Sequence, residues 1–600
     1  MGRISRYFYK TYTSLRITVL RFMPAPLFLV LLTVMVSFQM EGTFGSRNNQ
    51  TVTRLIYTAV LGAFAGTALE FLIERFSLSG VYKGLLKAAS VLSALLFYIF
   101  ATSPVKTDSI MLIRLLVLCF ALLSFYIWIP AFKKPGDFPA VALIHFKAFF
   151  VSALYSLVLT LGLLAIYYAV DLLLVKLDGK IPGHIINIMG AFFFPIYYLS
   201  LLPRLHSAAG EDREKREAAS AYPKFLEILV SYIALPLITA FTAVLAVYFL
   251  KILATLKWPV GELGPMVLAY SATGLVLFVL CGRLSNRFAV LYRRLFPPVL
   301  IPLVGLQLYS VFIRINAYGI TESRYYLALF GFYSVLCALY LLLSKNLRIG
   351  AVALLAACFA ILSVLPPVDA FTVSRTSQVA RVESILSRNH MLEQGKITPN
   401  ANVSASDRYE ITNIMNYLDR MGHISKLKGL PADYEEYRDF EKVFGFSPMY
   451  GPIQEPQSID WFNANIDQRL PLDVSGFDTL LKVGLYNSGT GSLNSLGFKM
   501  DGKDYRLDVI RTADDDITFT VFDPSGAKAL EVSIRPFLES LRAKDLYGDK
   551  NLLAPDALTF DSENGALRAR IIFENVNFRI DKDKPVGEIS GDTVILVGRR

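Results

Sequence analysis

The feature that most constrains this chain is a series of long apolar segments that stops at Pro366–Pro367. Up to that point, apolar stretches of roughly 20 residues alternate with short charged breaks, and none follows through Arg600. A stretch of about 20 apolar residues matches the roughly 30 Å hydrocarbon core of a bilayer. The sequence therefore predicts a polytopic α-helical membrane domain followed by a domain that folds in water.

We predict eleven transmembrane helices in the first part of the chain. Their ranges are 23–40, 55–73, 84–102, 110–132, 148–175, 184–203, 225–250, 264–282, 296–313, 325–343 and 348–366. The fifth is long enough to be tilted or to begin at the membrane interface. The first lacks a small-residue cleavage site before Glu41, so we interpret it as a retained anchor rather than a signal peptide.

Lys and Arg are distributed unevenly between alternate connecting segments, which predicts the orientation of the protein. Segments on the side of the membrane that holds the N-terminus contain 22 of these residues, and segments on the opposite side contain 8. Because basic loops stay in the cytoplasm, the N-terminus is predicted to lie inside. An odd number of spans then places residues 369–600 outside.

The net charge of +11 hides a division between the two parts of the chain. Residues 369–600 contain 28 Lys and Arg against 35 Asp and Glu, whereas residues 1–368 contain 32 against 14. A nucleic-acid-binding protein carries its basic excess on a water-exposed face. Here the excess lies beside the membrane spans, where it meets anionic lipid. We therefore predict the lipid bilayer as a partner and no nucleic acid.

Residues 369–600 are predicted to form an α+β domain. Residues 369–450 form a helical neck, with amphipathic segments at 374–391, 406–421 and 433–444. From Leu472 the apolar period changes to two, which predicts an antiparallel β-sheet module at 451–600 with one helix at about 534–544. Asp501-Gly502 is a hairpin signal, and a slip of phase at Glu574–Asn575 indicates a bulge or a turn. The membrane domain is assigned to residues 1–368.

The densest polar cluster beside the membrane is the predicted loop between the ninth and tenth spans. Together with a Gln inside the ninth span, it supplies the candidate ligand or coupling positions: Gln307, Arg314, Asn316, Tyr318, Thr321, Glu322 and Arg324. A structural role is the alternative, in which Thr321 caps the next helix and Glu322 pairs with Arg314 or Arg324. Gln307 would then bond a neighbouring helix.

Charged residues within the spans lie close to the predicted span ends. They are Glu70, Arg114, Asp171, Glu227 and Lys251. Side chains at such positions reach the headgroups at low cost, and no carboxylate lies at a midplane, which weakens the case for an ion-coupled carrier. Pro195, Pro236 and Pro302 interrupt three spans and can kink these helices, which favours a transporter. Pro is, however, also common in ordinary membrane helices.

Catalytic motifs are missing from the predicted water-soluble domain. Residues 369–600 contain two His, no Cys, and no HExxH, G-x-S-x-G or phosphate-binding Gly-Lys-Ser/Thr motif. All four Cys lie in apolar spans, which excludes disulfides and thiolate metal sites from this domain. We therefore predict no catalytic residue, no cofactor and no metal site, which favours a protein that is not an enzyme.

Several stretches resemble a bacterial family of membrane proteins, domain of unknown function 4153. They are Tyr222-Pro-Lys-Phe-Leu, Trp258-Pro-Val-Gly261, Tyr318-Gly-Ile-Thr-Glu-Ser-Arg-Tyr325 and Ser374-Arg-Thr-Ser-Gln-Val-Ala-Arg-Val-Glu-Ser-Ile-Leu386. The likeness covers roughly residues 190 to 420. It implies a location in the bacterial inner membrane and carries over no activity, so no residue gains a catalytic role from it.

Three functional hypotheses remain open. The first is a non-catalytic envelope scaffold or sensor whose domain at 369–600 binds a protein, glycan or lipid partner. The second is a transporter or a lipid-handling membrane protein, favoured by the many spans and the Pro-interrupted helices. The third is a polytopic glycosyltransferase that uses lipid-linked donors, which would need an outer-loop carboxylate near the first span. Glu41 is the one acidic residue between the first two spans.

Overall fold

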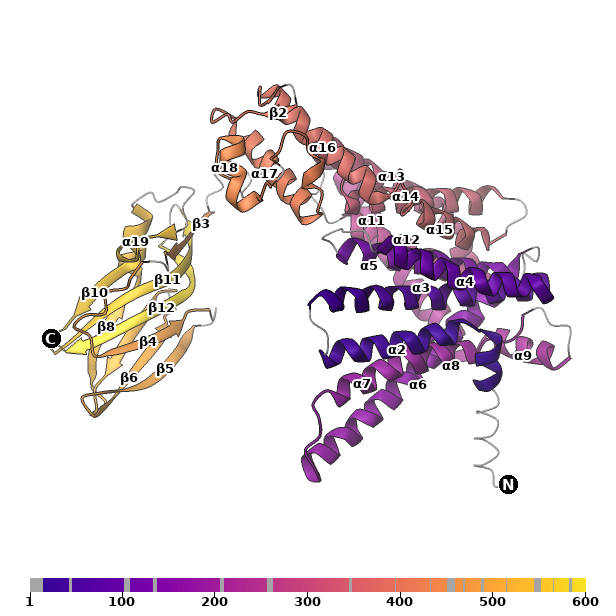
Figure 1. Ribbon diagram of the computed structural model, residues 1–600, viewed down its shortest axis with the longest axis horizontal. Coiled ribbons are helices and arrows are strands. Elements are labelled where there is room, and N and C mark those ends of the chain that lie inside the picture. Colours follow the sequence, from indigo (N-terminus) through magenta and orange to yellow (C-terminus); the bar gives the residue numbers. More distant parts are fainter. Residues whose placement is uncertain are drawn as a thin grey trace. The chain divides into compact units, whose positions relative to one another are not determined.

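The chain folds into two compact units, which comprise Met1–Lys396 with Ile414–Glu436, and Ile397–Asn413 with Tyr437–Arg600. The computed structural model (Figure 1) describes residues 15–42, 46–101, 108–132, 138–205, 210–255, 263–344, 348–393, 395–431, 433–449, 459–467, 470–486, 490–513, 515–543, 552–564, 566–581 and 585–599. The family-like stretch at 258–261 and the predicted domain boundary at 450 lie outside these ranges. The division into domains at 368 and 450 stays a prediction.

Apolar helices, all but α15 longer than 15 residues, make up most of the first unit. They are α2 (Ala25–Glu41), α3 (Ser46–Phe76), α4 (Gly80–Ala101), α5 (Asp108–Trp128), α6 (Phe138–Leu173), α11 (Leu235–Thr255), α12 (Leu263–Leu280), α13 (Arg287–Tyr318), α14 (Glu322–Leu343) and α15 (Ala351–Leu362). Helix α3 packs against α2, α4 and α5, and α13 packs against α14 (Figure 1). The polytopic membrane character predicted from the sequence is confirmed.

The prediction of eleven spans is too high. In the described parts of the chain, eight helices are long and apolar enough to cross a membrane. A ninth results if Leu15–Arg21 and α2, which meet at a bend of 102°, count as one span. Helix α15 has only 12 residues, or about 18 Å of helix, which is shorter than a hydrocarbon core of roughly 30 Å.

The predicted sixth span is divided into three helical pieces. They are α7 (Ile181–Asn187), the π-helix η3 (Ile188–Phe193) and α8 (Phe194–Ser200). A second π-helix, η4 (Leu229–Ala234), lies between α10 (Lys224–Ile228) and α11. In both places a proline is the second residue after the π-helix, Pro195 in α8 and Pro236 in α11. Because proline lacks the N–H donor that continues an α-helix, the preceding turn widens.

Three helices follow the last membrane helix. They are α16 (Ala370–Arg388), α17 (Ala405–Arg420) and α18 (Glu436–Phe444), and the short strands β1 (Leu392–Glu393) and β2 (Lys396–Ile397) lie between the first two. Helix α16 begins where the Asp369 carboxylate accepts hydrogen bonds from the backbone N–H groups of Phe371 and Thr372. The three amphipathic segments predicted from the sequence are therefore helical.

The strands of the second unit form two sheets. One has the order β4 (Thr479–Gly484), β12 (Gly587–Arg599), β11 (Leu567–Asp581), β3 (Ile459–Ile466) and β9 (Leu552–Leu553), with β10 (Thr559–Glu563) also paired to β11. The other has the order β5 (Gly491–Met500), β6 (Lys503–Arg511), β7 (Ile517–Phe522) and β8 (Lys528–Ser533). All pairs are antiparallel except β3 with β9, which is parallel. The predicted α+β class is confirmed.

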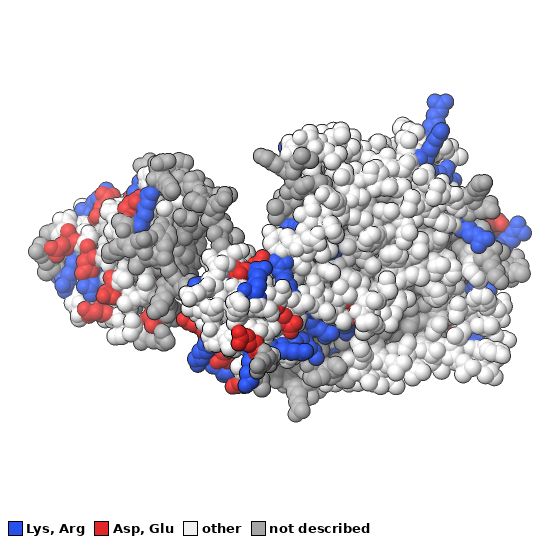
Figure 2. All heavy atoms as spheres, turned by 90° about the horizontal axis from the view of Figure 1, so that it is seen from above, with Lys and Arg blue, Asp and Glu red and all other residues white. Residues whose placement is uncertain are grey.

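The two sheets and α19 (Arg535–Ala543) share one hydrophobic core. The predicted hairpin at Asp501-Gly502 joins β5 to β6, with positive φ angles of 51° and 72° at its two central residues. The predicted slip of phase is a bulge within β11, between Phe573 and Asn575. In Figure 2 both signs of charge cover the strand-rich part, whereas the visible face of the membrane helices is largely uncharged.

Candidate functional site

The membrane helices enclose an apolar cavity of about 660 Å³. Its walls come from α2, α3, α5, α6, η3, α8, α12, α14 and α15, and it is not sealed from its surroundings. Ligand pockets in proteins measure roughly 300–1,000 Å³ and are lined mainly by apolar side chains. The size and lining of this cavity therefore suit a small apolar molecule or part of a larger one.

Small residues on facing helices create the space. They include Ala63, Ala142, Gly190, Ala191, Ala272, Ala353 and Ala356. A Cβ atom built on Gly190 would meet no other atom within 4 Å, so a side chain there would project into open space. Close packing would require longer side chains at these positions, and the cavity exists because the sequence lacks them.

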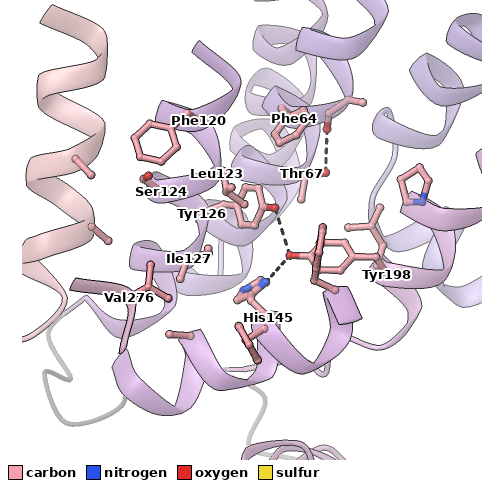
Figure 3. A pocket seen from close by; sticks show the side chains of 18 of the residues that line it. Phe64, Thr67, Phe120, Leu123, Ser124, Tyr126, Ile127, His145, Tyr198 and Val276 are labelled. Atoms are coloured by element: carbon pink, nitrogen blue, oxygen red, sulfur yellow. Dashed lines mark hydrogen bonds between the residues drawn. The ribbon is translucent and has the colours of Figure 1, made fainter. Parts of the chain in front are cut away.

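A chain of three polar side chains lies in the cavity wall (Figure 3). The Tyr198 hydroxyl is 2.7 Å from His145 Nδ1 and 3.3 Å from the Tyr126 hydroxyl. Each residue comes from a different helix, His145 from α6, Tyr198 from α8 and Tyr126 from α5. Phe71 stacks on Tyr126 at 5.8 Å between ring centroids and meets the edge of His145 at 5.7 Å. The aromatic contacts hold the three polar groups in place.

His145 is 4% exposed, and its Nε2 atom has no hydrogen-bond partner. When the imidazole is neutral and Nδ1 accepts from Tyr198, the proton lies on Nε2, which becomes a donor. A buried polar atom without a partner costs about 1–3 kcal/mol. Because His145 lines the cavity, a ligand with an oxygen at this point would remove that cost.

The predicted loop site is bound instead to helix α16. Gln378 Nε2 donates to the carbonyl oxygens of Tyr318 and Ile320, at 3.0 Å and 2.9 Å. The backbone N–H of Ile320 donates to the Ser377 hydroxyl at 2.9 Å. Arg324 donates to the carbonyl oxygens of Tyr318 and Gly319, at 3.2 Å and 2.8 Å. These bonds join two segments of the first unit.

The other predicted positions have separate environments. Glu322 accepts a hydrogen bond of 2.6 Å from the Tyr417 hydroxyl, rather than the expected ion pair with Arg314 or Arg324. Thr321 stands at the N-cap of α14 but makes no capping hydrogen bond. Gln307 is 2% exposed and donates to the Leu327 carbonyl of α14 at 3.3 Å.

Arg314 is half-buried and Asn316 is exposed, and both lie near the end of α13. Within the described ranges, none of the seven predicted positions lines the cavity. The structure therefore brings Tyr318 and Arg324 together at the junction with α16, whereas Glu322 contacts α17 and Gln307 contacts α14.

The cavity belongs to the part of the chain that the comparisons recognise. Residues 27–396 match the family described as Domain of unknown function (DUF4153). The chain belongs to this family. This match covers more of the N-terminal part than the resemblance inferred from the sequence, which spans roughly residues 190 to 420, and it ends earlier, at residue 396.

Relatives of this DUF4153 protein say little about its activity. The chain is 25% identical over 221 residues to an uncharacterized protein, PM1469, of Pasteurella multocida (strain Pm70). The alignment spans 36% of this chain and 35% of that protein, so the chain covers about a third of its relative. No solved structure matches the chain.

The three polar residues of the cavity in this DUF4153 protein are not among the positions predicted from the sequence. His145 precedes the predicted fifth span by three residues, whereas α6 begins at Phe138 and includes it. Tyr126 and Tyr198 lie within the predicted spans 110–132 and 184–203, where the sequence does not distinguish them from other apolar positions. The signal available was a His and two Tyr in apolar surroundings, and Pro195, which was singled out, does line the cavity.

Proposed function

We propose that this DUF4153 protein is a lipid-handling membrane protein that binds the acyl chain of a membrane lipid in the cavity. The observation that carries the proposal is an apolar space of about 660 Å³ among membrane helices with one unsatisfied polar atom, His145 Nε2, in its wall. Water finds too few polar partners in such a space to be stable there. Lipid chains surround these helices, and a lipid oxygen can accept the free proton of His145.

The lining argues against a carrier of polar solutes. None of the residues that line the described cavity is Asp, Glu, Lys or Arg. Of the three prolines that interrupt spans, Pro195 lines the cavity, whereas helix α13, with Pro302, and helix α11, with Pro236, contribute no lining residue to it. Coupled carriers place charged or unwound groups at their substrate site. The hypothesis of a partner for residues 369–600 stays a prediction.

We also propose that the N-terminus is cytoplasmic and that residues 369–600 lie outside the bacterial inner membrane. The bias of 22 to 8 basic residues supports the first part. The second part needs an odd number of spans, which holds if Leu15–Arg21 and α2 form a ninth span but not for eight spans. Reporter fusions after Arg600 that are active only in the cytoplasm would overturn this orientation.

Filling the cavity tests the lipid proposal. The full chain is incorporated into vesicles that contain a phospholipid with a photoreactive diazirine in its acyl chain, and labelled peptides are identified after irradiation. Gly190→Leu should lower labelling of the α6 and α12 lining residues by about tenfold, the effect of roughly 1.4 kcal/mol.

Gly162→Leu is the matched control, because Gly162 lies on α6 outside the lining and also has no atom within 4 Å of a built Cβ. It should leave labelling of the cavity residues unchanged. Equal labelling of those residues in the two variants would contradict the proposal.

A further inference from the structure

A second polar cluster joins the end of α2 to helix α7. Ser37 and Glu41 lie one turn apart on α2, and His184 lies on α7. The Ser37 hydroxyl is 3.3 Å from His184 Nδ1, and His184 Nε2 is 2.7 Å from Glu41 Oε1. Gly183 allows this close approach, since a Cβ atom there would lie 3.3 Å from the sulfur of Met40.

The partners determine where the protons lie. An ionised carboxylate only accepts hydrogen bonds, so His184 Nε2 carries a proton and donates a hydrogen bond to Glu41. Nδ1 of the neutral ring is then an acceptor, and the Ser37 hydroxyl donates to it. Lys180 Nζ lies 2.9 Å from Glu41 Oε2 and stabilises its negative charge. The three groups form a relay that leads from a hydroxyl through an imidazole to a carboxylate.

Asn187 determines the direction of the Ser37 hydroxyl. Its Nδ2 donates to Ser37 Oγ at 3.0 Å and to the Thr33 carbonyl at 2.8 Å. A helical Ser or Thr ordinarily donates to the carbonyl one turn earlier, as Thr33, Thr67, Ser271 and Ser334 do in this protein. For Ser37 that carbonyl belongs to Thr33 and receives Asn187 instead. The described contacts of Ser37 therefore direct its hydroxyl proton towards His184.

This geometry meets the requirements for an activated nucleophile. A hydroxyl within hydrogen-bond reach of a base, with the base held by a third group, is the pattern shared by serine hydrolases of unrelated folds. Separations somewhat above 3.2 Å between nucleophile and base are common before substrate binds. Ser37 is half-buried, so a substrate can reach it.

The surroundings of the relay indicate the class of substrate. On α2, Val34, Phe38 and Met40 are 41%, 44% and 41% exposed, and a membrane helix presents such side chains to lipid. Leu32, which lines the cavity, precedes Ser37 by about 7.5 Å along the helix. A molecule that reaches Ser37 therefore comes from the lipid phase.

We propose that Ser37 is the nucleophile of a site that hydrolyses carboxylic esters of membrane lipids, with His184 as general base. Ser37 Oγ attacks the ester carbonyl carbon while its proton moves to His184 Nδ1. The ester C–O bond then breaks, and His184 returns the proton to the departing alcohol oxygen. Water, deprotonated by His184, attacks the acyl-serine, which releases the carboxylic acid and restores Ser37. Glu41 and Asn187 are positioning residues.

This activity goes beyond lipid binding in the cavity and is tested separately. The full chain in lipid nanodiscs is treated with a fluorescent fluorophosphonate, which forms a covalent bond with activated serines, and the labelled peptide is identified by mass spectrometry. Labelling should occur at Ser37 and be absent in Ser37→Ala. His184→Asn should slow it by about 10²- to 10⁴-fold, the usual contribution of a general base.

The control is Ser93→Ala on α4, because the Ser93 hydroxyl makes the ordinary bond of 2.8 Å to the Ser90 carbonyl. In Ser93→Ala, Ser37 should be labelled at the wild-type rate. Asn187→Leu should slow labelling at Ser37, because it removes the hydrogen bond that directs the Ser37 hydroxyl towards His184.

If Ser37→Ala does not fold, Ser37→Cys with a thiol reagent provides the same test, and His184→Asn should slow its alkylation. Equal fluorophosphonate labelling in wild type and Ser37→Ala, or no labelling at Ser37, would overturn the ester-hydrolase proposal. Photolabelling of the cavity by the diazirine lipid would be unaffected by that outcome, so the two proposals can fail independently.

Discussion

The cavity wall and the loop that joins α13 to α14 differ in whether their polar groups have hydrogen-bond partners. The loop is rich in polar residues, and its carbonyl groups are bonded to Gln378 and Arg324. The cavity is nearly apolar, yet it contains a buried nitrogen of His145 without a partner. A polar group that is already satisfied contributes to stability, whereas an unsatisfied one leaves a position for a ligand. The density of polar residues in a sequence does not distinguish the two cases.

The largest expected effect lies in the loop. Gly319 has φ 71° and ψ 178°, a conformation almost restricted to glycine, and a Cβ atom there would lie 2.8 Å from Gln378 Nε2. Gly319→Val should therefore destabilise the protein by about 3 kcal/mol or more, from backbone strain and displaced packing. Thermal unfolding in detergent measures this change.

Gly305→Ala is the control for the loop, because Gly305 lies in α13 with no atom within 4 Å of a built Cβ. It should leave the unfolding temperature near that of the wild type or slightly above it. If Gly319→Val is as stable as Gly305→Ala, the hydrogen bonds of the loop do not stabilise the protein, and the loop does not differ from the cavity wall in this respect.

In the cavity wall, removing a polar group that has no partner should leave the stability of the protein nearly unchanged. His145→Phe removes the unpartnered nitrogen together with its cost, and the Tyr198 hydroxyl keeps the Tyr126 hydroxyl, 3.3 Å away, as a partner, so stability should change by less than about 1 kcal/mol. Tyr198→Phe leaves His145 Nδ1 without its partner and should destabilise the protein by about 1–3 kcal/mol. Unfolding of the two variants under identical conditions measures the difference. A His145→Phe variant that is the less stable of the two would show that the histidine serves folding rather than a ligand.

The smallest expected effect concerns His423, another histidine whose Nε2 has no partner. Burial and the nearby positive charges of Arg375, Lys426 and Arg114 lower the pKa of His423 below its ordinary value. The unfolded chain therefore binds a proton at His423 more readily than the folded protein does. The stability that depends on a neutral His423 is complete above about pH 6.5 and is lost as the pH falls through the folded-state pKa.

Thermal unfolding of the full chain between pH 7.5 and pH 5 measures the His423 contribution. The unfolding temperature should decrease on the acid side, and His423→Gln should make the decrease shallower. An unchanged slope in the variant would show that other groups cause the acid sensitivity.

Much of the fold could be predicted from the sequence because it depends on local patterns. Runs of apolar residues predict membrane helices wherever they occur, and alternation predicts strands such as β6 and β7. The hairpin at Asp501-Gly502 follows from two residues with strong turn preferences, and the bulge near Glu574 follows from a slip of phase in the apolar alternation. The number of spans was overestimated because hydropathy does not reveal that α15 has only 12 residues or that a π-helix interrupts the segment at 181–200.

The membrane helices and the α+β part could be predicted from the sequence, since an apolar residue can be buried against any apolar neighbour. Which polar groups remain unsatisfied depends instead on the tertiary structure. His145 and Tyr198 are 53 residues apart and Ser37 and His184 are 147 residues apart, so neither contact leaves a pattern in the chain. Hydrogen bonding depends on distances of a few tenths of an ångström, and helix packing alone sets those distances.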